Sequence, residues 1–172
     1  IKPFLKEGNI VSTEYAYHRV PHELDPFDNE VYKANPAKFY AVITELTTAK
    51  PEYVHVKDVF EQMDVLRASG SMPVVSKPVL IDGKEYLDGA LGDNIPFNWM
   101  LEQGVDKVVV ILTRAITYKK KPMSKVMCNL YKKKYPLFAK AMEDRHIYYN
   151  SQIEELKQLD LTNITPLDAL TQ

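Results

Sequence analysis

The dipeptide Asp82-Gly83 places the strongest constraint on how this chain folds. Two short runs rich in strand-forming residues, Pro78 to Ile81 and Lys84 to Leu87, lie directly on either side of it. A two-residue Asp-Gly connection favours a turn with positive φ angles, and the twist of that turn matches the twist of an antiparallel strand pair. The sequence therefore predicts a β-hairpin over residues 78–87.

The segment before this hairpin predicts two strands and a helix. Residues 39–46 are rich in aromatic and β-branched side chains, which is typical of a strand, and residues 53–56 form its expected hairpin partner. Asp58 is suited to cap a helix over residues 59–68, and Gly70 is a helix-ending signal. Residues 1–38 contain several turn signals and predict a loop with one short helix.

The segment after the hairpin indicates an α/β protein. Pro96 suits the first turn of a helix that closes at Gly104. Val105 to Thr113 is a nearly continuous apolar run, which predicts a strand that is covered on both faces. Because a short loop joins this helix to a buried strand, we expect an α/β sandwich.

Two further helices are predicted at the end of the chain, each opened by a proline. The first begins at Pro122, and its expected inner face consists of Met123, Val126, Met127, Leu130 and Tyr131. The second begins at Pro136, and its apolar stripe consists of Phe138, Met142, Tyr149, Ile153 and Leu156.

Composition describes an ordinary globular domain. The 172 residues are 45% hydrophobic and 26% charged, and 22 basic residues against 23 acidic ones give a net charge of −1. This length suits one domain. A single cysteine, Cys128, excludes a disulfide scaffold and a cysteine-based zinc site within the chain, and its place on an apolar helical face predicts a core residue. No apolar run is long enough to span a bilayer, and the opening residues do not resemble a signal peptide, so we expect a cytoplasmic protein.

The near-zero net charge hides a polarised distribution. Between Lys107 and Met142 there are ten basic residues and no acidic one. Seven lysines form the expected basic surface: Lys119, Lys120, Lys121, Lys125, Lys132, Lys133 and Lys134. A solvated helix face and an anionic membrane surface both account for this pattern, since each lysine near such a membrane adds roughly 1 kcal/mol. A nucleic-acid groove with stacking tyrosines ranks third, and we expect no nucleic-acid partner.

The histidines do not predict a metal site. His18 and His22 are four residues apart with Glu23 adjacent, but Pro21 is expected to interrupt the helix that a zinc-protease pattern requires, and the glutamate follows the second histidine. His55 and His146 have no partner at ligand spacing and are expected to be structural or surface residues.

The ordered run from Arg67 to Pro96 carries the clearest functional signal. Asp82-Gly83 already closes the hairpin, so Asp88 stands just past the end of its second strand, where a carboxylate can be directed into a cleft. A purely structural turn is the alternative for Asp88-Gly89, because turns of this composition are common.

This run resembles the patatin-like phospholipases, a family of serine acyl hydrolases. In that family an Ala-Ser segment ends a helix ahead of a proline, a Tyr-x-Asp-Gly-Gly or Tyr-x-Asp-Gly-Ala motif follows, and an Asn/Pro pair then opens a helix before a buried strand. The corresponding residues here are Arg67 to Pro73, Tyr86-Leu87-Asp88-Gly89-Ala90, Asn94-Ile95-Pro96 and Val108 to Leu112. The match is clear over about residues 39–113, with a helical C-terminal region over 114–172, and residues 1–172 are expected to be part of a single domain.

The resemblance implies a fold and a catalytic residue. The implied fold is a three-layer α/β/α sandwich of the patatin type, here incomplete. The family uses a Ser–Asp dyad, so Asp88 is implied to accept the proton of the nucleophilic serine, with Gly89 and Ala90 shaping the turn that presents it. No metal or organic cofactor is implied.

The family's nucleophile is missing from these residues. Its serine lies in a G-x-S-x-G elbow, and neither this motif nor a glycine-rich oxyanion loop occurs here. Ser69, Ser71 and Ser76 lie near the motif but lack glycines that would supply oxyanion donors, so we do not expect a local nucleophile.

Because the family places both missing parts upstream of the matched region, we expect this chain to be the C-terminal portion of a longer enzyme. That enzyme would cleave carboxylic esters of acyl lipids, and this chain alone would be inactive. The alternative is a non-catalytic membrane- or lipid-binding module that uses the basic segment 119–134.

Overall fold

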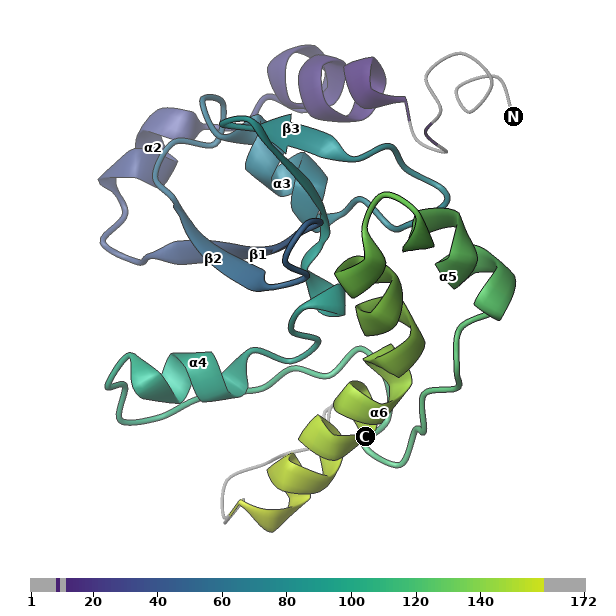
Figure 1. Cartoon of the computed structure of the whole chain (residues 1–172). Coiled ribbons are helices and arrows are strands. Elements are labelled where there is room, and N and C mark those ends of the chain that lie inside the picture. The colour runs from purple at the N-terminus through teal and green to yellow at the C-terminus, as the bar shows by residue number, and fades with distance from the viewer. Residues whose placement is uncertain (1–8, 10–11, 160–172) are drawn as a thin grey trace.

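A four-stranded antiparallel sheet forms the centre of the upper half of the molecule (Figure 1). The computed structural model describes residue 9 and residues 12–159. The strand order is β2-β1-β4-β3. The strands are β1 (Phe39–Glu45), β2 (Pro51–Val56), β3 (Val79–Ile81) and β4 (Lys84–Asp88).

Both predicted hairpins are confirmed. Strands β3 and β4 pair with Ile81 opposite Lys84, and the φ angles of Asp82 (48°) and Gly83 (79°) are the positive values that the two-residue turn requires. Strand β1 pairs with β2, which begins at Pro51, two residues earlier than predicted.

The helix after β2 is shorter than predicted. Helix α3 (Met63–Ser69) starts four residues later than residue 59, because the intervening residues form turns. The Asp58 carboxylate nevertheless caps this segment, since its Oδ1 accepts hydrogen bonds from the backbone N–H groups of Phe60 and Glu61 at 2.9 and 3.1 Å. Gly70 follows the helix as predicted.

Two helices rather than one precede the sheet. The first, η1 (Tyr15–Leu24), is a π-helix, and the second is α2 (Asn29–Ala34). The expectation that Pro21 interrupts a helix is wrong, because Pro21 lies inside η1. The π-helix bonds each N–H to a carbonyl five residues earlier, as between Asp25 and Val20 at 2.9 Å, so it does not depend on the usual four-residue ladder that proline disrupts.

The predicted strand over Val105 to Thr113 does not form. Helix α4 (Phe97–Glu102) and the turn at Gly104 are as predicted, but the chain after them belongs to no strand of the sheet. Val109 and Ile111 are 86% and 74% exposed, so the segment is covered on one face only. The physical reason is that no other strand among residues 12–159 lies beside it to complete a hydrogen-bond ladder.

Of the two final helices, the second matches its prediction and the first differs. Helix α6 (Pro136–Gln158) buries all five residues of its predicted stripe. Helix α5 (Lys125–Lys132) begins later than Pro122, and three residues of its predicted inner face are exposed instead: Val126, Met127 and Leu130. Cys128 is the fully buried residue of α5 and lies in the core as predicted, with Tyr131 packed against that core.

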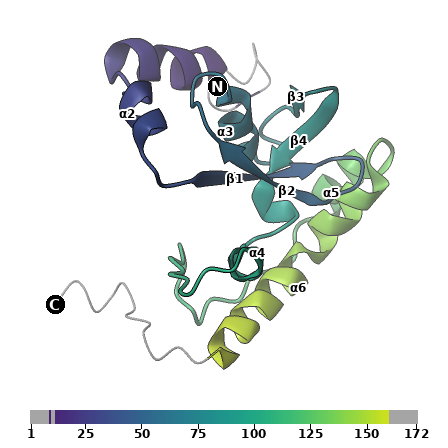
Figure 2. The same cartoon turned by 90° about the vertical axis from the view of Figure 1, so that its left-hand side faces the viewer.

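Helices cover both faces of the sheet (Figure 2). Adjacent strand residues point to opposite faces. Tyr86 therefore packs with Val65 of α3, while Leu87 packs with Phe138 and Met142 of α6. A third apolar cluster lies farther along α6, where Val108, Val110, Leu112 and Ile116 pack against buried side chains including Phe97 and Ile153. The arrangement is an α/β fold.

Candidate active site

Asp88 is the last residue of β4, one position inside the strand that the sequence predicted to end before it, and its backbone is held at the junction with the turn that follows. Asp88 lies opposite Ile43 of β1, and its N–H donates to the carbonyl oxygen of Ser71 at 2.9 Å. The Thr44 hydroxyl donates to the Asp88 carbonyl oxygen at 2.8 Å. Three separate segments therefore position this residue, which is what a rigid catalytic group requires.

The carboxylate of Asp88 has one oxygen engaged and one free. Oδ1 accepts the N–H of Ala90 at 2.8 Å and so caps the short 3₁₀ helix η2 (Gly89–Leu91). Oδ2 makes no hydrogen bond to any residue that the structure describes, and the side chain is only partly buried. The first contact fixes the orientation of the carboxylate, and the second oxygen remains available as a hydrogen-bond acceptor.

Gly89 is required by a close approach of two backbones. A Cβ atom at this position would lie 2.2 Å from the carbonyl oxygen of Val42 on β1. Because any side chain would displace that strand, the Asp-Gly pair turns sharply only with glycine in second place. This contact gives the motif glycine a structural role beside the aspartate.

Asp93 is a buried polar residue that sequence reasoning missed. Its Oδ2 accepts the Tyr53 hydroxyl at 2.5 Å, and its Oδ1 accepts the Gln152 amide at 2.7 Å. Burial, followed by the hydrogen bond to Asp93, raises the pKa of Tyr53 well above its usual range. Asp93 thus joins β2 to α6 behind the candidate site, and no local pattern in the sequence indicates this role.

A cationic cluster lies beside the Asp88 turn. Lys120 Nζ and Arg145 Nε donate to the same oxygen, Asn94 Oδ1, at 3.2 and 3.3 Å. Arg145 Nε also lies 3.2 Å from the Ala90 carbonyl oxygen. Burial, followed by the charge of Arg145, lowers the pKa of Lys120 to about 8, while the charge of Asp88 acts in the opposite direction.

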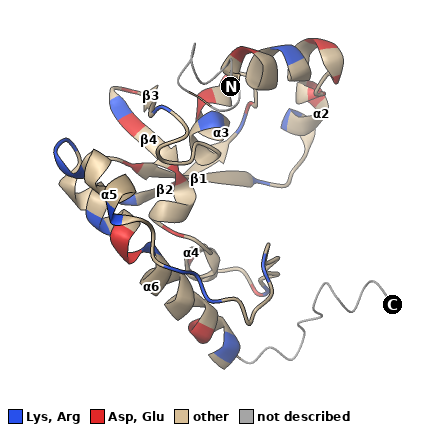
Figure 3. Ribbon diagram, turned by 90° about the vertical axis from the view of Figure 1, so that its right-hand side faces the viewer, with Lys and Arg blue, Asp and Glu red and all other residues tan. Residues whose placement is uncertain are grey.

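Sequence reasoning placed Lys120 on a basic surface, and the structure corrects that assignment. Lys120 is partly buried, with its Nζ 4.3 Å from the centre of the Tyr149 ring, and Lys119 and Lys134 form ion pairs with Glu154 and Glu85. Four lysines are exposed without an ion pair among the described residues: Lys121, Lys125, Lys132 and Lys133. Figure 3 shows this basic region along α5 and the loop before it.

The nearby serines do not contact the Asp88 carboxylate. The Ser71 hydroxyl is buried and donates to the Arg67 carbonyl oxygen at 2.7 Å, so only its backbone touches Asp88. No hydrogen bond links the Asp88 carboxylate to Ser69 or Ser76 within the described part of the chain. None of these three serines therefore forms a hydrogen bond with the Asp88 carboxylate in the described structure.

Two histidines take part in ring stacking, and a third makes a hydrogen-bond contact. His22 stacks on Phe60 with ring centres 4.2 Å apart, and His55 stacks on Tyr40 at 5.0 Å. His146 Nδ1 lies 2.9 Å from the Glu143 carbonyl oxygen. Across residue 9 and residues 12–159, no three His, Cys, Asp or Glu side chains gather in a way that could hold a metal ion.

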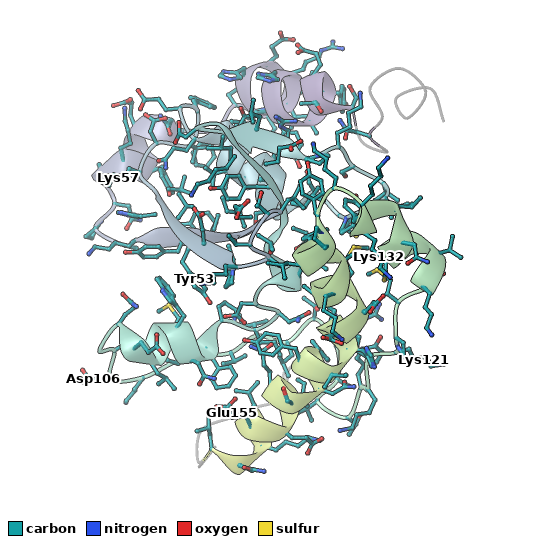
Figure 4. The ribbon with its side chains drawn as sticks, viewed as in Figure 1. Tyr53, Lys57, Asp106, Lys121, Lys132 and Glu155 are labelled. Carbon is teal, nitrogen blue, oxygen red and sulfur yellow. The ribbon has the colours of Figure 1, made fainter. Side chains whose placement is uncertain are left out.

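An aromatic cleft of about 430 Å³ lies between the sheet and α4. Trp99 of α4 stacks on Tyr53 of β2 with ring centres 4.5 Å apart, and Tyr40 of β1 meets the same indole edge-on at 4.9 Å. Figure 4 shows Tyr53 directed from β2 towards α4. Val42, whose carbonyl contacts Gly89, also lines this cleft, so an apolar wall begins close to the Asp88 turn.

Comparison with known protein families identifies the family to which this chain belongs. The patatin-like phospholipase family matches the chain over residues 3–100, which is more than half of its length. The chain therefore belongs to the patatin-like phospholipase family and has the expected α/β fold. No curated protein and no solved structure matches the chain significantly.

Family membership indicates a lipid hydrolase in general terms and agrees with the predicted relationship. None of the helices in the described ranges is both long and apolar enough to cross a bilayer.

Proposed function

We propose that Asp88 is the proton acceptor of a Ser–Asp dyad in a serine acyl ester hydrolase, and that the nucleophilic serine lies upstream of this chain in a longer polypeptide. The observation that carries the proposal is the asymmetry of the Asp88 carboxylate, with Oδ1 held by the Ala90 N–H and Oδ2 unbonded within the described structure. A serine hydroxyl is a weak nucleophile until a positioned base removes its proton.

The substrates that fit are carboxylic esters of acyl lipids. The free Oδ2 takes the serine proton as the hydroxyl attacks the ester carbonyl, and the same proton is then available to the departing alcohol. The acyl-serine formed in this way is hydrolysed by water, with Asp88 again serving as the base. The cleft lined by Tyr40, Tyr53 and Trp99 offers an apolar surface for an acyl chain.

The test is hydrolysis of short-chain nitrophenyl esters by the longer gene product. Asp88→Asn keeps an oxygen that can accept the Ala90 N–H but removes the base, so kcat should fall by roughly 10²–10⁴-fold while the fold is retained. Asp82→Asn is the matched control, because Asp82 is exposed at the hairpin turn and asparagine tolerates its positive φ. Unchanged turnover in Asp88→Asn would remove the dyad assignment.

We also infer a second function, peripheral membrane binding in the cytoplasm, and the exposed face of α5 supports the membrane contact. Val126 and Leu130 are one helical turn apart and 72% and 65% exposed, and Lys125 and Lys132 flank them. An apolar stripe beside unpaired lysines suits an anionic lipid surface. The same surface serves the alternative, a non-catalytic membrane-binding module, and an enzyme that acts on lipid also needs such contact.

Vesicle sedimentation tests this surface. The chain should sediment with vesicles that contain phosphatidylserine and less so at high salt, and the double change Lys132→Gln and Lys133→Gln should weaken binding about tenfold or more. The control is Lys57→Gln with Lys77→Gln, two exposed lysines outside α5, and Figure 4 shows Lys57 far from Lys132. Equal loss in both double variants would contradict a specific surface.

A further inference from the structure

Three side chains beside Asp88, those of Asn94, Lys120 and Arg145, have more hydrogen-bond donors than they have acceptors among the described residues. The Nδ2 atom of Asn94 is buried and has no partner among the described residues. The terminal nitrogens of Arg145 make no hydrogen bond there, since only its Nε is engaged. Lys120 Nζ has Asn94 Oδ1 as its only hydrogen-bond acceptor in the described chain. Of these groups, Asn94 Nδ2 is the buried one, and a buried donor without an acceptor carries a desolvation penalty that an added ligand acceptor would remove.

The positive charge of this cluster is only partly compensated within the described structure. Lys120 and Arg145 both lie within 3.3 Å of one amide oxygen, and neither forms an ion pair within the described structure. Arg114 adds a third positive charge that acts on Lys120. Asp88 supplies one negative charge, so the local field stays positive, and two cations held so close together favour an anion between them.

The cluster is held rigidly before any ligand arrives. Asn150 of α6 accepts the Lys120 N–H at 2.8 Å and donates to the Lys120 carbonyl oxygen at 3.1 Å, so this residue is clamped from both sides. Arg145 belongs to the same helix, one turn before the Tyr149 ring that lies against Lys120. Donors that are already in place lose little conformational freedom on binding.

From this arrangement we infer that Asn94, Lys120 and Arg145 form a binding site for a phosphate group next to Asp88. A phosphate offers three acceptor oxygens to an amide, an ammonium and a guanidinium, and arginine suits its geometry particularly well. The assignment of this phosphate to the headgroup of the ester substrate rests on the proposed function. The site itself stands on the contacts of this chain alone.

Phosphate binding by the 172-residue chain tests the site without any turnover. Isothermal titration with inorganic phosphate and with sn-glycerol 3-phosphate should give saturable binding, and sodium acetate should give none at the same concentration. Lys120→Gln and Arg145→Gln should each weaken binding about tenfold or more, because each removes a charge-assisted hydrogen bond. Arg145→Lys should restore part of the affinity, since it keeps the charge but not the planar donor geometry of the guanidinium.

Lys121→Gln is the matched control, because Lys121 is the next residue, is exposed and has no ion pair in the described structure. Its affinity should equal that of the unchanged chain, and thermal melting should show that every variant folds. Should Lys120→Gln not fold, Arg145→Gln with its lysine rescue decides the question alone.

Each contrary result removes a defined part of the inference. Unsaturable binding, or equal weakening by Lys121→Gln, overturns the site, and acetate binding as tight as phosphate overturns the phosphate class. If the chain binds inorganic phosphate but does not bind glycerol 3-phosphate, the headgroup assignment is overturned. Failure of the dyad is a separate result, since it is measured as hydrolysis of neutral nitrophenyl esters, and phosphate binding does not depend on it.

Discussion

At the scale of single residues, Asp88 and Gly89 are each constrained by one contact. Asp88 is constrained by a neighbour in the chain, and Gly89 by a strand that is distant in the sequence. The carboxylate is oriented by a hydrogen bond to a residue two positions away, Ala90. The glycine is required by the backbone of Val42, which is distant in sequence and adjacent in space. The sequence predicts the first requirement from the turn composition, and the second becomes visible only when β1 lies against the turn.

Gly89→Ala should strongly destabilise the protein. The new Cβ would lie 2.2 Å from the Val42 carbonyl oxygen, and relieving that overlap requires movement of β1 or η2. We expect a loss of about 2 kcal/mol or more in the free energy of unfolding, measured by urea denaturation.

Gly70→Ala is the control for this change. A Cβ there meets its nearest atom, the Tyr17 hydroxyl oxygen, at 3.5 Å, and its φ of −94° is open to alanine. The unfolding free energy should stay within about 0.5 kcal/mol or rise slightly. A comparable loss in both variants would contradict the close-approach explanation.

At the scale of elements, the segment Val105 to Thr113 shows how an extended run depends on its neighbours. Alternation places Val108, Val110 and Leu112 against the apolar cluster of α6, while Val109 and Ile111 face outward. Its composition is that of a strand buried on both faces, but no paired strand covers its outer side within the described structure. The hydrophobic pattern therefore predicts an extended backbone. Because no strand of the described structure lies beside this segment, its backbone has no partner for the hydrogen bonds of a β-sheet.

Paired substitutions along this segment test that one-sided packing. Val110→Ala removes methyl groups that pack on the cluster with Tyr149 and Ile153, and it should lower the free energy of unfolding by about 0.5–1.5 kcal/mol. Val109→Ala is the matched change at an exposed position and should alter it by less than about 0.5 kcal/mol. Equal effects of the two changes in urea denaturation would contradict one-sided packing of this segment.

At the scale of the whole molecule, Glu85 ties the sheet to the helical half. Its carboxylate on β4 accepts hydrogen bonds from Lys134 Nζ, at 2.8 Å, and from the Tyr135 hydroxyl, just before α6. These two donors, Lys134 first, hold the pKa of Glu85 below its usual value of 4.5. A depressed carboxyl pKa means that the folded state gains stability from the ionised form.

Glu85→Gln should therefore lower the melting temperature in a pH-dependent way. The stabilisation is present above pH 4.5, where Glu85 is ionised in both states, and it is lost as the pH falls through the lower pKa of the folded state. The difference in melting temperature between the variant and the parent should be largest near neutral pH and should shrink in acid. Solvent screening of the exposed Lys134 keeps the effect modest.

Glu61→Gln is the control, since the Glu61 side chain is exposed and makes no hydrogen bond or ion pair within the described residues. Its melting curve should follow that of the parent at every pH. A pH-independent loss in Glu85→Gln would contradict the ionic explanation.

The sequence by itself determined those features that depend on neighbours in the chain. The Asp82-Gly83 hairpin follows from turn chemistry, the buried stripe of α6 follows from helical periodicity, and the place of Asp88 follows from the end of its strand. These features depend only on local backbone preference and on the spacing of apolar residues, so they can be predicted before the fold is known.

Only the tertiary structure decided which charges act together and which faces are covered. Lys120 is one of seven lysines in a basic run. Its backbone is hydrogen-bonded to the Asn150 side chain, thirty positions later on α6, and this contact distinguishes it from the other six lysines. Asn94 and Arg145 reach it from two further places in the chain. Burial and convergence of this kind arise from packing between distant segments, and no local pattern of residues encodes them.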